Sequence, residues 1–104
     1  PLIERVDFES AAARIEERAG WIDVRLPDEF GNGHIESATN VPLFFLRMKA
    51  QRLDPARTWI LYCDTGRRSS AAAFILSERG FDVRVLKKGL AGVPADAITT
   101  GGSV

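Results

Sequence analysis

Apolar residues along the chain form short runs that are separated by longer stretches with a different spacing. Mainly apolar runs at residues 21–24, 59–62 and 83–86 each predict a buried strand. The run at 59–62, Trp-Ile-Leu-Tyr, is apolar throughout, which is typical of a strand buried on both faces of a parallel sheet. Weaker patterns at residues 3–6 and 40–41 predict two further short strands.

The stretches between these runs carry apolar residues at helical spacing. Asp7 is a good N-cap for a first helix, which we expect to end at Gly20. Residues 43–52 predict a second helix and residues 69–79 a third, which Gly80 ends. Strands that alternate with helices imply right-handed crossovers and a parallel sheet covered on both faces. The predicted fold class is therefore α/β, with three layers (α/β/α) around a five-stranded parallel sheet.

The chain of 104 residues has the length of one domain. The alternating pattern covers residues 1–92, which we predict to be the folded domain, and the weakly patterned residues 93–104 are predicted to form a weakly structured tail. No apolar run approaches the ~20 residues that span a bilayer, and no signal peptide is recognisable. The first residue is Pro1 rather than methionine, which is compatible with processing or with a longer parent protein.

Charge is balanced overall but unevenly distributed. The chain has 14 basic and 14 acidic residues. Residues 1–36 hold four arginines against nine acidic residues, whereas residues 37–90 hold ten basic against four acidic residues. Nucleic-acid binders usually show a stronger basic excess together with a groove-reading or base-stacking motif, and this chain has neither. A small anionic substrate is therefore expected, with no nucleic-acid and no membrane partner.

The cysteine count limits the chemistry further. Cys63 is the single cysteine and His34 the single histidine. One cysteine excludes an internal disulfide, a Cys-x-x-Cys redox pair and a zinc site of several thiolates, so we expect no metal. A lone free cysteine fits a reducing compartment, which predicts a cytoplasmic location. Most such residues are buried structural cysteines, so the neighbours of Cys63 decide its role.

Those neighbours are typical of a reactive thiol. Cys63 ends the most apolar strand, a short polar loop with Gly66 follows, and a helix is predicted to start near Ser69. Ligands of open α/β sheets bind beyond the carboxyl ends of the strands. The loop N–H groups, the positive end of the helix, and the side chains of Arg67 and Arg68 each favour the thiolate. The thiolate is therefore predicted to be well populated at neutral pH.

Three motifs occur in order along the chain. Residues 63–69 match a pattern of Cys, two residues, Gly, one residue, Arg and Ser. Residues 23–30 match Asp-Val-Arg followed by Glu-Phe, and residues 33–42 match Gly-His-Ile followed by Asn and Pro. With these motifs the chain resembles the rhodanese family of sulfurtransferase domains over most of its length. Ser37 and Lys88 stand where that family usually has glycine.

The resemblance implies a sulfurtransferase that works by double displacement through a cysteine nucleophile. The Cys63 thiolate would take the outer sulfur of an anionic donor such as thiosulfate as a persulfide, release sulfite, and pass the sulfur to a thiol or cyanide acceptor without any cofactor. Arg68 would be the second catalytic residue, which braces the loop and faces the anion. The residues expected to bind substrate are Asp64, Thr65, Gly66, Arg67 and Ser69.

The remaining motif residues are expected to be structural. Asp23 and Arg25, at a strand end, are expected to hold loops together by hydrogen bonds, and Glu29 is expected to be structural too. By the resemblance, His34 lies in a surface loop away from the nucleophile, so no general-base role is assigned to it.

Two other functions remain as alternatives. A cysteine phosphatase or arsenate reductase needs five residues between Cys and Arg, and here that position is Ser69. This alternative is therefore disfavoured. The other is a rhodanese-like sensor or interaction module of a larger multidomain protein. The presence of Cys63 and of the glycine loop favours activity over a purely binding role.

Overall fold

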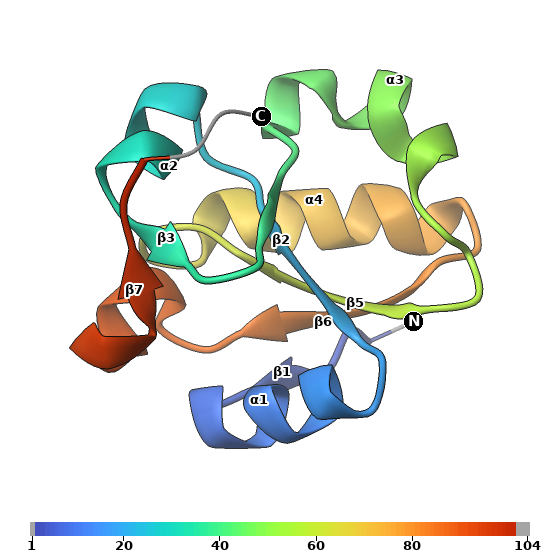
Figure 1. The fold of residues 1–104 in the computed structure, drawn as a ribbon. Helices are drawn as coiled ribbons and strands as arrows, with labels where there is room; N and C mark the ends of the chain where they lie inside the picture. Colours follow the sequence, from blue (N-terminus) through green and yellow to red (C-terminus); the bar gives the residue numbers. More distant parts are fainter. Residues whose placement is uncertain (1, 102–104) are drawn as a thin grey trace.

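A central parallel sheet with helices on both faces forms the molecule (Figure 1). The structure, a computed structural model, describes residues 2–101. The sheet has five strands in the order β1-β6-β5-β2-β4, and all its pairings are parallel. Its strands are β1 (Arg5–Val6), β2 (Gly20–Asp23), β4 (Thr39–Asn40), β5 (Thr58–Tyr62) and β6 (Asp82–Leu86). The predicted α/β class and the five-stranded parallel sheet are confirmed.

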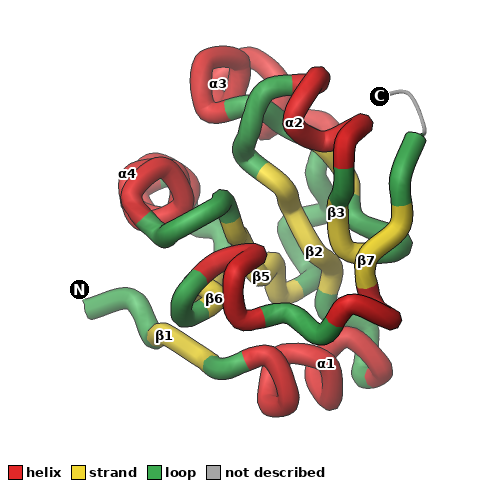
Figure 2. The backbone as a smooth tube through the Cα atoms, turned by 90° about the vertical axis from the view of Figure 1, so that its left-hand side faces the viewer, coloured by secondary structure: helices red, strands yellow, loops and turns green. Residues whose placement is uncertain are grey.

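Helices lie on both faces of the sheet (Figure 2). Two hydrophobic clusters join them to these faces. The helices that take part are α1 (Phe8–Glu16) on one face, and α3 (Leu46–Lys49) and α4 (Arg67–Glu78) on the other. Neighbouring residues of β5 point to opposite faces, so Leu61 packs in the α4 cluster while Ile60 and Tyr62 pack in the α1 cluster. Within the described residues, no helix is long and apolar enough to cross a membrane.

All three predicted helices have different boundaries in the structure. The first helix, expected to end at Gly20, ends at Glu16, and Gly20 is the first residue of β2. The turn between them contains Arg18 with a left-handed φ of 84°, which does not continue a helix.

α4 begins at Arg67 rather than Ser69, because Gly66 has a left-handed φ of 118° and turns the loop into the helix. The helix predicted over residues 43–52 is divided into three pieces. These are the 3₁₀ turn Leu43–Phe45, α3, and the 3₁₀ turn Ala50–Arg52. Leu46 and Ala50 are the only buried residues of this stretch, so packing against the core does not support a continuous helix.

The predicted tail contains ordered structure in its described part. Residues Ala95–Ala97 form a 3₁₀ turn, and β7 (Ile98–Thr99) pairs antiparallel with β3 (His34–Ile35) outside the main sheet. Ile98 packs against the α1 cluster, which explains why this segment is held in place. A strand of two residues is too short to show an alternating pattern, so the sequence did not predict it. Residues 102–104 of the predicted tail lie outside the described residues.

Both positions where the resembled family usually has glycine adopt left-handed backbone. Ser37 has a φ of 72° and Lys88 a φ of 63°. For a residue with a Cβ atom this conformation costs about 1–2 kcal/mol. The chain therefore accepts local strain at two turns, and one of them, at Lys88, lies next to the turn that packs on the Cys63 loop.

Candidate active site

The loop between β5 and α4 is held at the carboxyl edge of the sheet. Cys63 follows the last residue of β5, and β5 is flanked on both sides by β6 and β2. The 3₁₀ turn Gly89–Gly92 packs against the loop, and the Leu90 N–H donates to the Cys63 carbonyl at 2.8 Å. The position of the thiol is therefore set by the strand, the loop, the helix start and this turn together.

The sulfur of Cys63 lies inside a ring of hydrogen-bond donors. The Gly66 N–H donates to Sγ at 3.0 Å and the Ser69 N–H at 3.4 Å. The Ser69 hydroxyl lies 3.4 Å from Sγ and 3.1 Å from the Gly66 carbonyl, so its proton can turn to the sulfur when the thiol ionises. Cys63 and Ser69 are both 0 % exposed. A substrate therefore reaches the Cys63 sulfur only when the loop or a neighbouring side chain moves.

These contacts control the ionisation of the thiol. Burial alone raises the pKa of Cys63, because it removes water from the thiolate. Hydrogen bonds from the Ser69 hydroxyl and from the N–H groups of Ser69, Gly66 and Thr65 outweigh burial and lower the pKa below its ordinary range. Arg67 and Arg68 were expected to supply part of this effect, whereas the largest lowering contributions to the pKa of Cys63 come from the hydrogen bonds of the loop.

Arg68 is bound to one carboxylate of the loop itself and to one from a distant segment of the chain. Its guanidinium donates to the two Glu29 oxygens at 2.7 and 3.0 Å, and it lies 3.4 Å from the Asp64 carboxylate. Glu29 belongs to α2 (Pro27–Asn32), and its hydrogen bonds with Arg68 lower its pKa to about 2. Arg68 thus ties the first turn of α4 to α2. Because two carboxylates already neutralise it, its guanidinium is not free to face a substrate anion.

The fold and this loop can be compared with known proteins. The family model of the rhodanese-like domain matches residues 7–96. The chain belongs to the rhodanese-like domain family. The match covers most of both hydrophobic clusters, the whole Cys63 loop and most of the sheet, so the resemblance seen in the motifs extends to most of the fold.

Several relatives of this rhodanese-like domain are sulfurtransferases. It is 38 % identical over 63 residues to the thiosulfate sulfurtransferase PspE of Escherichia coli, covering 59 % of this chain and 61 % of that protein. It is 36 % identical over 72 residues to a tRNA sulfurtransferase of Vibrio parahaemolyticus, covering 65 % of this chain and 15 % of that protein. The chain thus spans less than two thirds of the length of these relatives.

Solved structures agree with the assignment. A rhodanese with anions from E. coli is 35 % identical, with a TM-score of 0.65 over 80 % of this chain and 99 % of that one. A rhodanese-related protein from Thermoplasma volcanium is 26 % identical, with a TM-score of 0.81 over 92 % of this chain and 97 % of that one. A rhodanese-like domain protein from Staphylococcus aureus, 17 % identical with a TM-score of 0.86 over 96 % of this chain and 100 % of that one, shares the fold.

The other loop residues of this rhodanese-like domain are open to solvent. Asp64, Thr65 and Arg67 are exposed. The Asp64 carboxylate accepts the Thr65 N–H at 2.8 Å, so it contributes to the loop turn as well as to the Arg68 pair. Arg67, in the first turn of α4, has no carboxylate within salt-bridge distance among residues 2–101. Its side chain is therefore the loop cation that is available to a ligand.

Asp23 and Arg25 form a buried pair at the end of β2. The Arg25 guanidinium and backbone N–H donate to the Asp23 carboxylate at distances from 2.7 to 3.2 Å. The same guanidinium donates to the Gly33 carbonyl at 2.6 Å, and Asn40 donates to the carbonyls of Asp23 and Arg25 at 2.9 Å. These contacts fasten the end of β2 to the end of β4 and to Gly33, which follows α2.

His34 is buried in β3 rather than placed in a surface loop. Its ring stacks on Phe30 with the centroids 3.6 Å apart, and Nδ1 forms a hydrogen bond of 2.7 Å with the Phe30 carbonyl. The expectation of a surface position is wrong, because the β3–β7 pair and α2 enclose this residue. The ring is engaged in packing, and the structure gives it no contact with Cys63.

One cavity adjoins the loop. It has a volume of about 270 Å³ and shares Arg68 with the loop. Its other walls are the apolar side chains of Val24, Leu26, Leu43 and Phe44. The cavity beside Arg68 is therefore largely apolar where the start of α2 and the 3₁₀ turn Leu43–Phe45 form its walls.

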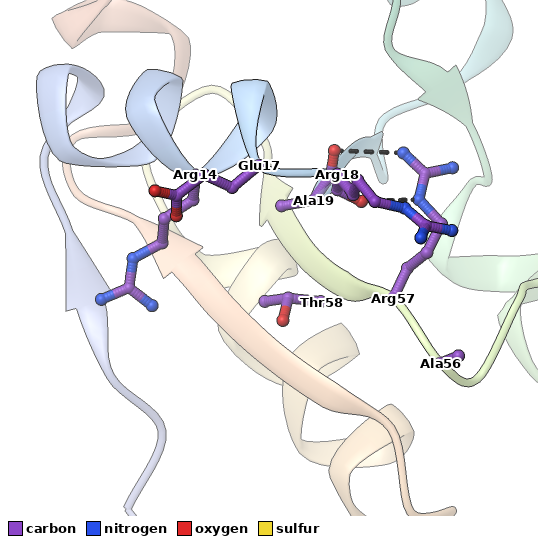
Figure 3. Close-up of a pocket in the computed structure, with 7 residues that line it drawn as sticks. All are labelled: Arg14, Glu17, Arg18, Ala19, Ala56, Arg57 and Thr58. Carbon is purple, nitrogen blue, oxygen red and sulfur yellow. Dashed lines mark hydrogen bonds between the residues drawn. The ribbon is translucent and has the colours of Figure 1, made fainter.

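A second cavity, of about 480 Å³, lies at the opposite end of the sheet (Figure 3). Ala19, in its wall, precedes β2, whereas Cys63 follows the end of β5. Figure 3 shows Arg57 reaching the backbone there, where it donates to the carbonyls of Arg18 and Ala19 at 2.8 and 3.0 Å. The Arg57 guanidinium also lies 4.6 Å over the Trp59 ring. Arg57 thus closes the turn before β2, far from the sulfur site.

Alkylation of Cys63 should report the lowered pKa directly. Because the thiolate is the reactive form, the rate with iodoacetamide should rise with pH and level off, with a midpoint below the free-thiol value of about 8.5. Cys63 is the single cysteine, so the reaction can be followed by intact mass. Removing the Ser69 hydroxyl in Ser69→Ala should move the midpoint upward. A wild-type midpoint at or above the free-thiol value would mean that burial outweighs the hydrogen bonds of the loop.

Replacing Gly89 by alanine should distort the loop. A Cβ at Gly89 would lie 2.5 Å from the Cys63 carbonyl oxygen and 2.6 Å from that of Asp64, at a φ of +53°. These distances are far below van der Waals contact, so the backbone that carries the thiol must move. Since an error of 1 Å at a reacting group can cost about 100-fold, we expect kcat/KM for sulfur transfer to fall by at least about 10-fold.

The matched control for Gly89→Ala is Gly31→Ala. A Cβ at Gly31 meets no atom within 4 Å, so this variant should retain the wild-type rate. Steady-state sulfur transfer and the melting temperature are measured for both variants. Wild-type kinetics in Gly89→Ala would show that the turn at Gly89 does not position the thiol.

Proposed function

We propose that this rhodanese-like domain is a sulfurtransferase that carries a sulfane sulfur on Cys63 as a persulfide, with thiosulfate or a similar small anion as donor. The ring of hydrogen-bond donors around Sγ, from Gly66 and Ser69, is the observation that carries the proposal. A structural cysteine needs no such ring, whereas a nucleophilic thiolate is stabilised by it.

The reaction balances without an oxidant, a metal or an organic cofactor. The Cys63 thiolate attacks the outer sulfur of thiosulfate, a bond forms between the two sulfurs, and the sulfur–sulfur bond of thiosulfate breaks. Its electron pair leaves on sulfite, and the new terminal sulfur keeps one negative charge. Cyanide or a thiolate acceptor then attacks that terminal sulfur. This step forms thiocyanate or the acceptor's persulfide and returns the Cys63 thiolate.

The start of α4 supports the charge that this chemistry creates. The first N–H groups of a helix have no carbonyl partner within the helix and carry a partial positive charge. In α4, the Ser69 N–H already bonds to Sγ, and the Arg67 and Arg68 N–H groups occupy the same unpaired turn. We assign them, with the Gly66 N–H, the role of holding the terminal sulfur of the persulfide and the leaving anion.

The residues of the loop and the single cysteine also support a proposal for the donor, the acceptor and the cellular location. The loop cation Arg67 and the small, closed site favour a small anionic donor, and a cellular thiol is the natural acceptor where cyanide is absent. Nucleic acid and membrane are not part of this proposal.

The lone unpaired thiol suits a reducing compartment, and we place the domain in the cytoplasm. The names of the relatives, thiosulfate sulfurtransferase among them, agree with this chemistry.

Intact mass spectrometry after incubation with thiosulfate tests the proposal. The protein should gain the mass of one sulfur atom and release one equivalent of sulfite, and cyanide should remove the added sulfur as thiocyanate. In parallel, phosphatase activity is measured with a colourless aryl phosphate as the phosphate that is released. Absence of a sulfur adduct, or phosphate release without sulfur transfer, would refute the proposed function.

A further inference from the structure

We propose that Arg5, which belongs to β1 and to none of the three motifs, binds the donor together with Arg67 and makes the site prefer dianionic over monoanionic sulfur donors. This inference rests on the proposed function and names the substrate class of the same site.

Arg5 lies beside the loop although it is 58 residues before Cys63 in the chain. β1 is the edge strand and pairs with β6, with Arg5 opposite Val85. The Arg5 Nη2 atom lies 3.8 Å from the point that a Cβ of Gly66 would occupy. Since the Gly66 N–H is 3.0 Å from Sγ, the guanidinium lies within about 9 Å of the sulfur.

The side chain of Arg5 reaches the loop along the start of α4. It lines a cavity of about 250 Å³ whose walls include Ser70 and Phe74 of α4 and Val85 of β6. Arg5 is exposed, so its charged end remains in contact with solvent. An arginine that packs its stem on apolar surface and keeps its guanidinium at the surface can bind an anion without a large desolvation cost.

The charges around the loop leave the Arg5 guanidinium available to bind an anion. Among residues 2–101, no carboxylate lies within salt-bridge distance of Arg5, and its sequence neighbour Glu4 pairs with Arg14 and Arg84 instead. Arg68 is neutralised by Glu29 and Asp64, as described above. Of the three arginines at the loop, Arg5 and Arg67 therefore carry the positive charge that is not balanced by a carboxylate. Two such guanidinium groups suit a donor with two negative charges.

These two arginines act on binding rather than on ionisation. The pKa of Cys63 is lowered mainly by hydrogen bonds within the loop, so removal of Arg5 should leave the thiolate population unchanged. The positive charge at the loop would instead raise the local concentration of the anionic donor and hold it at the entrance. Ionic strength screens such an effect, because the Debye length at physiological salt is about 8 Å, close to the distance between the guanidinium and the sulfur.

The experiment compares two donors and three variants. Persulfide formation is measured with thiosulfate, a dianion, and with methanethiosulfonate, a monoanion, for the wild type, Arg5→Gln and Arg5→Lys. Arg79→Gln is the matched control, since Arg79 caps the carboxyl end of the 12-residue α4, about 18 Å from its start. The pH midpoint of Cys63 alkylation is measured for each variant as a check on the loop.

We expect Arg5→Gln to raise KM for thiosulfate by about 3-fold to 5-fold with little change in kcat, as loss of an exposed ionic contact does. KM for methanethiosulfonate should change by less than that, Arg5→Lys should recover most of the loss, and high salt should reduce the difference. Arg79→Gln and the alkylation midpoint should match the wild type. Equal changes for both donors, no change for either, or the same change in Arg79→Gln would overturn the role of Arg5.

The failure of the proposed function would look different. In that case the wild type itself would take no sulfur from thiosulfate, whatever residue stands at position 5. The role of Arg5 is then measured by protection, because thiosulfate bound at the loop should slow alkylation of Cys63 by iodoacetamide. Weaker protection in Arg5→Gln than in the wild type would support an anion-binding role, and equal protection would exclude it.

Discussion

Replacing Cys63 by serine is expected to abolish sulfur uptake from thiosulfate completely. The loop can hold a serine, because its Oγ would accept the same N–H groups of Gly66 and Ser69 that bond to the sulfur. An alcohol is not ionised at neutral pH, and oxygen does not form the sulfur–sulfur bond on which the persulfide depends. The variant should therefore fold normally, gain no mass with thiosulfate and release no sulfite.

The interpretation of that variant is simple because Cys63 is the only cysteine in the chain. No other thiol can replace it, so any sulfur retained by Cys63→Ser would have to sit on a different kind of group. Circular dichroism and the melting temperature establish that the variant is folded. Ser69→Ala is the matched comparison, since it keeps the thiol but loses one hydrogen bond, and it should slow sulfur uptake rather than abolish it. Sulfur uptake by folded Cys63→Ser would disprove the nucleophile assignment.

The core of the site could be predicted because it is local in sequence. A buried strand, a loop with Gly66 and a helix follow one another within residues 59–78, and parallel sheets place such loops at their carboxyl edge. The hydrogen bonds to the sulfur join residues at most six positions apart. Short-range geometry of this kind follows from the order of residue types. The exact start of α4 does not follow from the order of residue types, because it depends on the left-handed conformation of Gly66.

The partners of the loop could not be predicted because they come from distant segments. Glu29 binds Arg68 across 39 positions, and this contact depends on the way α2 returns over the carboxyl edge of the sheet. Arg5 reaches the loop because β1 pairs with β6 at the sheet edge, a strand order that hydrophobic patterns do not encode. Sequence alone therefore located Cys63 and its loop at the carboxyl edge of the sheet, whereas the electrostatic surroundings of the loop required the fold.

Removing the Arg25 side chain is expected to cause the largest loss of stability of the substitutions considered for this domain. Asp23 is 0 % exposed and Arg25 6 % exposed, and the guanidinium supplies three of the hydrogen bonds to the Asp23 carboxylate. In Arg25→Ala the carboxylate stays buried without its counter-charge, and the Gly33 carbonyl loses its donor. Breaking a buried pair on one side typically costs about 3–5 kcal/mol of the free energy of unfolding.

Urea unfolding of matched variants tests this prediction. Arg52→Ala is the control, because Arg52 is exposed and its replacement should change the free energy of unfolding by less than about 0.5 kcal/mol. The double variant Asp23→Ala/Arg25→Ala should be more stable than Arg25→Ala alone, since it removes the uncompensated charge together with its partner. If Arg25→Ala is too unstable to fold, the double variant and the control still give the comparison. A loss in Arg25→Ala no greater than in Arg52→Ala would show that this buried pair does not hold the end of β2 in place.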